Sequence, residues 1–131
     1  MKITGIKTNI FSSQHKNAKR NWLVVRIQTN EGLEGIGEAS MLSYDPMVQT
    51  LIQQWAEGYL IGKDPMSGQV HWTRLHQDNL GRGGRLFSTA LSGIDIALWD
   101  LRGKILDTPV YKLLGGPYQE KIRVYANGWY T

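Results

Sequence analysis

Residues 92–116, SGIDIALWDLRGKILDTPVYKLLGG, are the stretch that decides the fold of this 131-residue chain. They continue an apolar pattern at helical spacing that runs over Phe87, Ala90, Leu91, Ile94, Ala97, Leu98, Leu101 and Ile105. An apolar stripe of this length has to face a core. Pro109 then starts a short helix, which Gly115 and Gly116 can end because glycine tolerates left-handed backbone. The stretch predicts one long core helix followed by a short one.

Three strands are predicted ahead of that helix. Apolar and polar residues alternate over residues 3–10 and 22–29, and a turn at residues 30–32 leads into a third segment at residues 33–39. One side of this third segment carries Leu33, Gly35, Gly37 and Ala39. Because glycine has no side chain, we expect another element to approach the backbone of this strand closely.

Two Asp-Pro pairs mark the start of two further helices. Asp45-Pro46 and Asp64-Pro65 each place an acceptor side chain at the N-cap and proline at the first helical position, and the second helix is expected to reach about Leu80. Residues 122–130, IRVYANGWY, have strand-forming composition but no next partner along the chain. The expected fold class is α+β, a three-stranded antiparallel sheet followed by a helical bundle.

The composition excludes several classes of protein. Cysteine is absent, which rules out disulfides, thiolate metal sites and thiol catalysis. Hydrophobic residues make up 41% of the chain, which favours a packed core over disorder. No apolar run has the length of a membrane span, and the first residues lack the apolar stretch of a signal peptide. We therefore expect a cytoplasmic protein without a membrane partner.

The net charge of +4 arises from the first part of the chain, where six basic residues precede the first acidic residue, Glu31. The only basic cluster lies at residues 16–20, which indicates either a solvated loop or a polyanion-binding module. Binding to phosphates would weaken steeply with added salt, and this dependence separates the two interpretations. We expect no nucleic-acid partner.

The individual motifs do not add up to an active site. The GRGG segment at residues 81–84 lacks the spacing and the lysine of a phosphate-binding loop, although Arg82 and Arg85 leave an anion site at the start of the long helix as an alternative. His71 and His76 lie five residues apart on one helix, so they cannot chelate a metal, and we expect partly buried surface histidines. The sequence predicts neither catalytic residues nor metal ligands.

Residues 92–116 strongly resemble the end of the N-terminal capping domain of the enolase superfamily, particularly of its mandelate racemase and muconate lactonizing branch. The order of elements is similar too: three strands, helices, an [AS]xxxIDxALWDxxGK-like helix, a TPVYKLLGG-like turn and a VYANG segment. The resemblance implies that residues 1–121 form a capping domain. It also implies that residues 122–131 are the first strand of a (β/α)₇β barrel whose remainder is missing.

The resemblance also implies a function. In this superfamily, barrel carboxylates hold Mg²⁺, and a lysine or histidine removes the proton α to a substrate carboxylate. All these groups would lie beyond Thr131, so we expect the chain alone to be inactive and to belong to a longer enzyme. The expected activity is that of a sugar-acid dehydratase. A racemase, epimerase or cycloisomerase of the same superfamily is the alternative, and a non-catalytic interaction module is a remote one.

Two loops of the cap are implied to cover the substrate, at residues 12–21 and 41–45. In the first loop, His15, Lys16 and Arg20 suit the hydroxyl groups and carboxylate of a small sugar acid. Tyr44 matches a substrate-contacting tyrosine of the family. Asn127 matches a substrate-facing position of the first barrel strand, whereas Tyr125 is expected in the core. The strand at residues 122–130 would leave an unpaired edge, so we expect a homo-oligomer.

Overall fold

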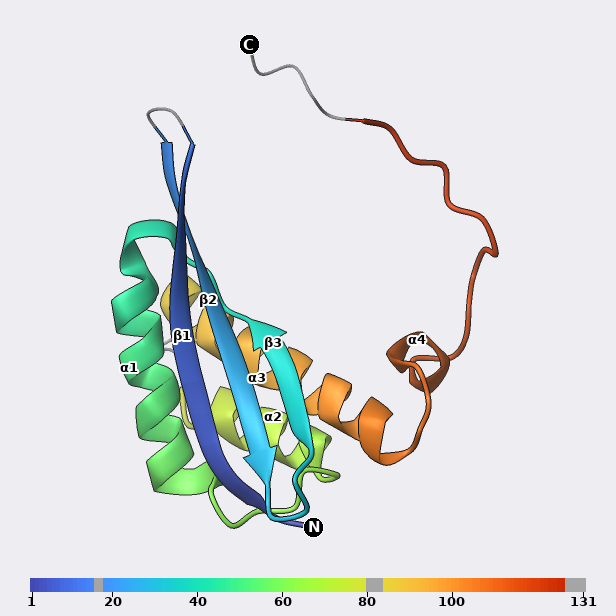
Figure 1. Cartoon of the computed structure of the whole chain (residues 1–131). Coiled ribbons are helices and arrows are strands. Elements are labelled where there is room, and N and C mark those ends of the chain that lie inside the picture. Colours follow the sequence, from blue (N-terminus) through green and yellow to red (C-terminus); the bar gives the residue numbers. More distant parts are fainter. Residues whose placement is uncertain (16–17, 80–83, 127–131) are drawn as a thin grey trace.

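The computed structural model describes residues 1–15, 18–79 and 84–126, with the backbone alone at residues 14, 15, 18 and 19. Three antiparallel strands form one sheet in the order β1-β2-β3: β1 (Ile3–His15), β2 (Ala18–Thr29) and β3 (Glu34–Glu38). The helical elements are η1 (Leu42–Tyr44), α1 (Asp45–Trp55), η2 (Ala56–Leu60), α2 (Gly68–Gln77), α3 (Gly84–Ile105) and α4 (Val110–Leu113). Helices α1, α2 and α3 lie on one face of the sheet, and no helix among the described residues covers the other face (Figure 1). The predicted α+β class and three-stranded sheet are confirmed.

The core lies between the inner face of the sheet and the stripe of α3. Leu23, Val25 and Ile27 alternate along β2 with partly exposed residues and are fully buried. Six members of the predicted helical stripe are buried as well: Ala90, Leu91, Ile94, Ala97, Leu98 and Leu101. Each large aliphatic side chain removed from water in this way contributes about 1.5–3 kcal/mol. The periodicity of both elements therefore identified the core correctly.

Helix α3 rests directly on the backbone of β3. A Cβ added at Gly35 would lie 2.1 Å from the carbonyl oxygen of Ala97, and one at Gly37 would lie 2.1 Å from that of Gly93. Real side chains do not come this close, so only glycine fits at these two positions of β3. The close approach predicted from the small residues of this strand is confirmed.

Side chains from the helices occupy both edges of the sheet. On the outer edge of β3, Asp100 Oδ2 accepts the backbone N–H of Ile36 at 2.8 Å, and Lys104 Nζ donates to the carbonyl oxygen of Glu34 at 2.8 Å. On the outer edge of β1, Gln49 Nε2 donates to the carbonyl oxygen of Thr8 at 3.2 Å. Edge groups that are bonded in this way are not free to pair with another strand.

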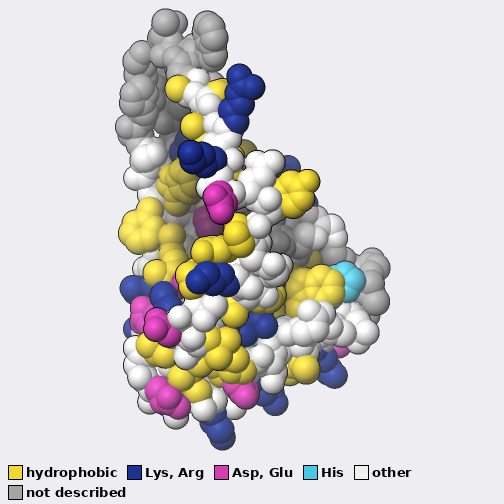
Figure 2. Space-filling model, turned by 90° about the vertical axis from the view of Figure 1, so that its right-hand side faces the viewer, with side chains coloured by type: hydrophobic (Ala, Val, Ile, Leu, Met, Phe, Trp, Pro, Cys, Tyr) yellow, Lys and Arg dark blue, Asp and Glu magenta, His cyan; other side chains and the backbone are white. Residues whose placement is uncertain are grey.

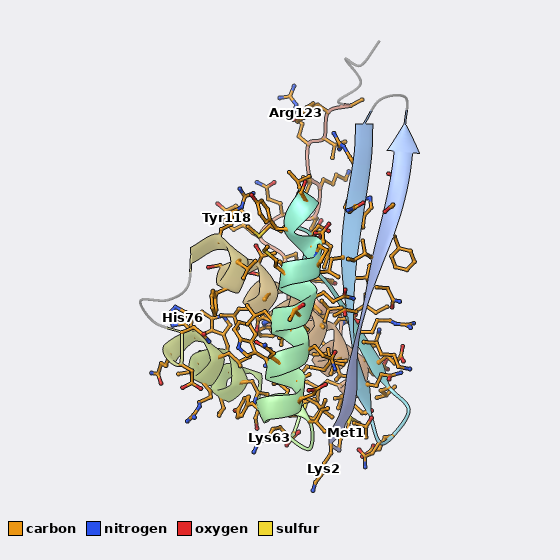
Figure 3. The ribbon with its side chains drawn as sticks, turned by 90° about the vertical axis from the view of Figure 1, so that its left-hand side faces the viewer. Met1, Lys2, Lys63, His76, Tyr118 and Arg123 are labelled. Atoms are coloured by element: carbon orange, nitrogen blue, oxygen red, sulfur yellow. The ribbon has the colours of Figure 1, made fainter. Side chains whose placement is uncertain are left out.

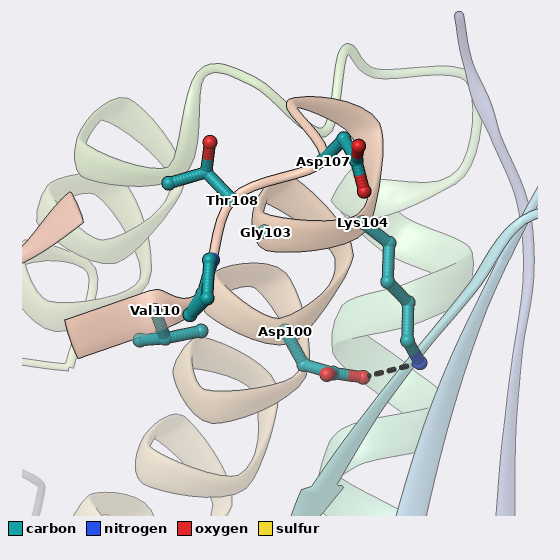
Figure 4. Close-up of a pocket in the computed structure, with 7 residues that line it drawn as sticks. Asp100, Gly103, Lys104, Asp107, Thr108 and Val110 are labelled. Atoms are coloured by element: carbon teal, nitrogen blue, oxygen red, sulfur yellow. Dashed lines mark hydrogen bonds and ion pairs between the residues drawn. The ribbon is translucent and has the colours of Figure 1, made fainter. Parts of the chain in front are cut away.

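The last turns of α3 and the start of α4 border a small, open hollow of about 290 Å³ (Figure 4). Asp100 and Lys104 line it and form an i, i+4 ion pair, with 2.7 Å between Oδ2 and Nζ. Asp107, at the turn that ends α3, has a positive φ of 46°. Because Lys104 reaches from the hollow to β3, this ion pair has a structural role.

Several predicted boundaries differ from the structure. Helix α1 begins at Asp45 itself, and α2 begins at Gly68 because the Asp64 carboxylate accepts the N–H of Met66 in a turn before the helix. Residues 122–126 are assigned to no strand, and Tyr125, expected in the core, is 85% exposed because no described element packs on it. The rest of the predicted strand lies outside the described residues. Within the described part of the chain, no helix is both long and apolar enough to span a membrane.

Candidate functional site

The candidate site is the end of the molecule where β1 and β2 project beyond β3. Strand β3 pairs with β2 only from Val24 to Gln28, whereas β1 and β2 stay paired as far as His15 and Ala18. The chain between β3 and α1 turns at the base of this projecting ribbon (Figure 1). We refer to residues 12–21 together with residues 41–45 as the hairpin end. The two loops that were predicted to act together thus lie at the same end of the sheet.

The segment predicted as the first loop is largely a two-stranded ribbon, which corrects the expectation. Register continues past Ile10 and Leu23, with Ser12 opposite Asn21 and Ser13 opposite Arg20. The Ser12 hydroxyl donates to Asn21 Oδ1 at 2.8 Å across the two strands. The ribbon has no core beneath it, so its residues are polar and lack the apolar alternation by which strands are recognised.

The second loop, residues 41–45, is closed by its own hydrogen bonds. Asp45 Oδ1 accepts the N–H of Met41 at 2.6 Å, and the N–H of Tyr44 donates to the carbonyl oxygen of Met41 at 3.0 Å. The loop is held to β2 because the N–H of Leu23 donates to Ser40 Oγ at 2.9 Å. Asp45 therefore does not cap α1 as predicted, since its side chain turns back into the preceding loop.

Tyr44 is presented to solvent by this loop. Its side chain is 54% exposed, and those of Leu42 and Met47 beside it are also exposed. Leu42 has a positive φ of 51°, an uncommon conformation for a residue with a branched side chain. An exposed phenol next to apolar side chains offers one hydrogen-bonding group and an apolar contact surface to a ligand.

The alternation of β1 and β2 distributes the polar groups of the ribbon over two faces. Ser12 and Asn21 lie two residues from the partly buried Ile10 and the fully buried Leu23, so they lie on the face toward α1. Arg20 lies on the opposite face and is exposed. The Ser12–Asn21 pair was not singled out from the sequence. The signal that could have identified it is the period of two, because Ser12 and Asn21 occupy the next positions after Ile10 and Leu23 on the same face of the two strands.

The predicted substrate contacts stay predictions, and the structure places only some of the residues concerned. The backbone of His15 pairs with Ala18, but its side chain is not described. Lys16 and Asn127 lie outside the described residues. Arg20 and Tyr44 are both at the hairpin end, Arg20 on the face of the ribbon away from the helices and Tyr44 in the loop before α1. Of the GRGG segment, Gly84 alone is described and begins α3 with a φ of 71°.

The donor groups of the hairpin end do not fit Mg²⁺. That ion prefers several carboxylate oxygens in octahedral geometry, together with water. The only acidic residue of the hairpin end is Asp45, which is fully buried and already accepts a backbone N–H with one oxygen. Across the described residues, no group of three or more His, Asp or Glu side chains is arranged to hold a metal ion.

The two histidines of α2 have structural contacts. His71 is buried rather than partly exposed as expected, because Tyr59 and the turn at Asp64 cover it. Its Nε2–H donates to the carbonyl oxygen of Asp64 at 2.8 Å, so Nδ1 is free to accept the Tyr59 hydroxyl at 3.0 Å. His76 stacks on Trp72 with 4.7 Å between ring centroids. Neither residue belongs to the hairpin end.

Residues 4–115 match the family described as mandelate racemase / muconate lactonizing enzyme, N-terminal domain. The chain belongs to this family, and the predicted capping domain is confirmed at this level.

Among curated relatives, the chain is 42% identical over 108 residues to a D-galactonate dehydratase of Verminephrobacter eiseniae, covering 82% of this chain and 28% of the relative. It is 38% identical over 126 residues to a D-galactonate dehydratase of Variovorax paradoxus, covering 96% of this chain and 31% of the relative. The chain thus spans less than a third of the length of these two relatives.

Solved structures of the enolase superfamily share the fold. A member from Polaromonas sp. JS666 has a TM-score of 0.81 and 35% identity, covering 89% of this chain and 34% of that chain. An enolase of Agrobacterium radiobacter with bound sodium and L-malate has a TM-score of 0.82 and 33% identity, covering 95% of this chain and 30% of that chain. A 3,6-anhydro-D-galactonate cycloisomerase of Zobellia galactanivorans has a TM-score of 0.80 and 30% identity, covering 88% of this chain and 32% of that chain.

Proposed function

We propose that this chain is the substrate-covering domain of a sugar-acid dehydratase, and that its hairpin end closes over the active site of a catalytic barrel. The observation that carries the proposal is the position of the two loops. The β1–β2 ribbon and residues 41–45 lie at one end of the sheet, and the second of these segments exposes Tyr44 directly before α1. A lid of this kind excludes water and contacts the distal part of a substrate.

The polar character of the hairpin end supports a sugar acid as the substrate. Ser12, Asn21 and Arg20 offer hydroxyl, amide and guanidinium groups that can bond to sugar hydroxyls or to a carboxylate. Two relatives that match this chain are D-galactonate dehydratases, and L-malate, a small carboxylate, is bound in a structural neighbour. His15, Lys16 and Asn127 remain proposed contacts of the same substrate.

Mg²⁺ and the groups that move the proton belong, in this proposal, to the barrel of a longer enzyme. The metal would stabilise the negative charge that develops when the proton α to the carboxylate is removed. The residues of the hairpin end bind and orient the distal part of the substrate and exclude water. They supply neither a metal ligand nor a general base.

A chimeric enzyme tests the proposal. In the D-galactonate dehydratase of Variovorax paradoxus, the matched 126-residue segment is replaced by this chain, and dehydration of a panel of sugar acids is measured with added Mg²⁺. We expect turnover of at least one sugar acid. Tyr44→Ala should lower kcat/KM roughly tenfold, as expected for one lost hydrogen bond together with its apolar contact. Lys2→Ala, at the opposite end of the sheet (Figure 3), is the matched control and should leave kcat/KM unchanged.

Two outcomes would contradict the proposal at different points. If a folded chimera dehydrates no sugar acid while the parent enzyme does, this cap does not serve that substrate class. If the chimera is active but Tyr44→Ala has the kinetics of the unaltered chimera, the hairpin end does not cover the substrate.

An isomerase is the second candidate, because a cycloisomerase is among the structural neighbours. The cap would then cover a sugar-acid derivative in the same way, while the acid and base groups of the barrel decide the reaction. A second chimera, with this chain in place of the matching segment of that cycloisomerase, would show by its turnover of the anhydro-sugar acid whether this cap serves the substrate of a cycloisomerase.

A further inference from the structure

Asp45 is an acidic side chain that lies in the interior with only one of its two oxygens bonded. It is the first residue of α1 and is fully buried, whereas Tyr44 directly before it is exposed. Its Oδ1 accepts the N–H of Met41 at 2.6 Å, and its Oδ2 is buried without a hydrogen bond to the described residues. A buried acceptor that lacks a partner lowers stability. Stability alone therefore does not account for a carboxylate at this position.

The side chain of Asp45 does not serve its own helix. Aspartate at the start of a helix commonly accepts N–H groups of the first turn, but α1 begins without a side-chain cap hydrogen bond. The second Asp-Pro pair of the chain behaves differently, because the exposed Asp64 accepts the N–H of Met66, two residues further along. Asp45 instead reaches four residues back, to Met41. Its role lies in the loop that precedes the helix.

Met41 closes this loop through both of its backbone groups. Its N–H donates to Asp45 Oδ1, and its carbonyl oxygen accepts the N–H of Tyr44 at 3.0 Å. Between these bonds, Leu42 has a φ of 51°, which is unfavourable for a residue with a side chain. The two hydrogen bonds thus hold the backbone in a shape that Leu42 by itself does not favour.

The place of Tyr44 is set by this backbone more than by packing. Its side chain is 54% exposed, and those of Leu42 and Met47 are exposed as well, so the surrounding side chains constrain the ring only weakly. The two ends of the loop are anchored, because Met41 packs against the core and Asp45 is fully buried. A loop with anchored ends and an exposed middle presents the phenol from a position that its ends determine.

We propose that Asp45 is a positioning residue of the substrate-covering domain, which closes the loop through Met41 and thereby places Tyr44 against the substrate. The inference rests on the proposed function, because it needs Tyr44 to contact the substrate. Asp45 acts through Tyr44 and does not touch the substrate, since its own side chain is fully buried. A contacting group that is misplaced by about 1 Å can cost about a hundredfold in rate, so a loop that is closed in advance favours catalysis.

A double-mutant cycle in the Variovorax paradoxus chimera tests the inference. Asp45→Ala should lower kcat/KM about tenfold, as Tyr44→Ala does. The double variant should stay within about twofold of Tyr44→Ala, because both changes remove the same contact. Asp45→Asn keeps an oxygen for the N–H of Met41 and should stay within about twofold of the unaltered chimera. Asp64→Ala, which removes the aspartate of the other Asp-Pro pair, is the matched control and should leave kcat/KM unchanged.

Amide hydrogen exchange of the 131-residue chain measures the loop directly. In Asp45→Ala the N–H of Met41 should exchange at least tenfold faster, whereas Asp45→Asn and Asp64→Ala should keep the original rate. Where Asp45→Ala does not fold, Asp45→Ser replaces it in both experiments. Serine suits the start of a helix, but its hydroxyl is one bond closer to the backbone than the carboxylate oxygen that binds Met41.

Different results separate this inference from the proposed function. If Tyr44→Ala leaves kcat/KM unchanged, the hairpin end does not cover the substrate and both are overturned. If Tyr44→Ala lowers kcat/KM but a folded Asp45→Ala variant does not, only the positioning role of Asp45 is wrong. The same conclusion follows if the two effects multiply to about a hundredfold, if Asp45→Asn is as impaired as Asp45→Ala, or if the exchange of Met41 does not change.

Discussion

Asp95 lies half-buried on α3, about one turn before Trp99 and two turns before Arg102. Burial raises the pKa of Asp95 above its usual value, and the charge of Arg102 and a hydrogen bond from Trp99 oppose that rise only in part. The Arg102 guanidinium itself stacks 3.7 Å above the centre of the Trp99 ring, which gives it a second partner. The ionised form of Asp95 is therefore less favourable in the folded chain than in water.

Replacing Asp95 by asparagine should stabilise the protein near neutral pH. Because the pKa in the folded state lies above the unfolded value of about 3.8, the folded chain binds a proton more tightly. This contribution to stability is fully present below the unfolded pKa and is lost as pH rises through the raised pKa. We expect Asp95→Asn to have the larger free energy of unfolding at pH 7 and no advantage at pH 3.5, as measured by urea titration at both pH values. A gain that is equal at both pH values would show that the ionisation of Asp95 plays no part.

At the scale of elements, the contact between β3 and α3 depends on glycine. A Cβ at Gly37 would lie 2.1 Å from a carbonyl oxygen of α3, whereas a Cβ at Gly5 would have an ordinary contact, 3.6 Å from the side chain of Gln28. Gly37→Ala should lower the free energy of unfolding by about 3 kcal/mol or more, because the helix has to move away from the sheet. Gly5→Ala, the matched control, should change it by less than about 1 kcal/mol. Equal effects of the two substitutions would mean that α3 does not rest on β3 as described.

Asp100 also holds α3 to β3, because its carboxylate accepts the backbone N–H of Ile36. Its role is therefore larger than that of an i, i+4 ion pair alone. Asp100→Ala removes the acceptor of the Ile36 N–H as well as the partner of Lys104 and should cost about 1–2 kcal/mol. Asp100→Asn keeps an oxygen for Ile36 and loses only the charge, so its cost should be about 0.5 kcal/mol. Urea unfolding of both variants measures the difference. Equal costs would assign the whole effect to the ion pair.

The elements that bury apolar residues are the ones that could be predicted from the sequence. The alternation of β2 and the stripe of α3 correspond to the residues that form the core. The sequence predicts a loop where the structure has the ribbon from Ser12 to Asn21, because a strand pair without a core beneath it shows no apolar period. The start of α2 was placed too early, because a turn held by Asp64 uses the same Asp-Pro signal as an N-cap.

The candidate site was predictable in position more than in detail. The resemblance to a capping domain pointed to residues 12–21 and 41–45, and the structure brings these segments to one end of the sheet. The burial of Asp45, the Ser12–Asn21 pair and the face on which Arg20 lies depend on strand register and loop closure. Short-range patterns do not specify contacts between residues that are far apart in sequence.

At the scale of the whole molecule, the exposed surfaces lie in different places. The hairpin end is at one end of the sheet, and the open sheet face lies opposite the helices. A third surface, on the side of β3, α3 and α4, shows apolar side chains among charged ones (Figure 2) and includes a hollow of about 470 Å³ lined by Ile36, Ile96, Trp99, Asp100, Lys104, Val110 and Leu114. A domain of this size that leaves so much apolar surface exposed is well suited to contact other protein surfaces.

The isolated 131-residue chain is expected to show no dehydratase or racemase activity toward sugar acids, even with Mg²⁺ added. Proton abstraction next to a carboxylate needs a metal or another strong electrophile to stabilise the resulting charge, together with a base within hydrogen-bond reach of the substrate. At the hairpin end the one acidic residue, Asp45, is fully buried, and the described residues hold no cluster of metal ligands. The measurements, at high protein concentration, are a coupled assay for the keto product of dehydration and polarimetry for racemisation. Turnover that rises in proportion to the chain and disappears with a chelator would show that these residues are sufficient for catalysis.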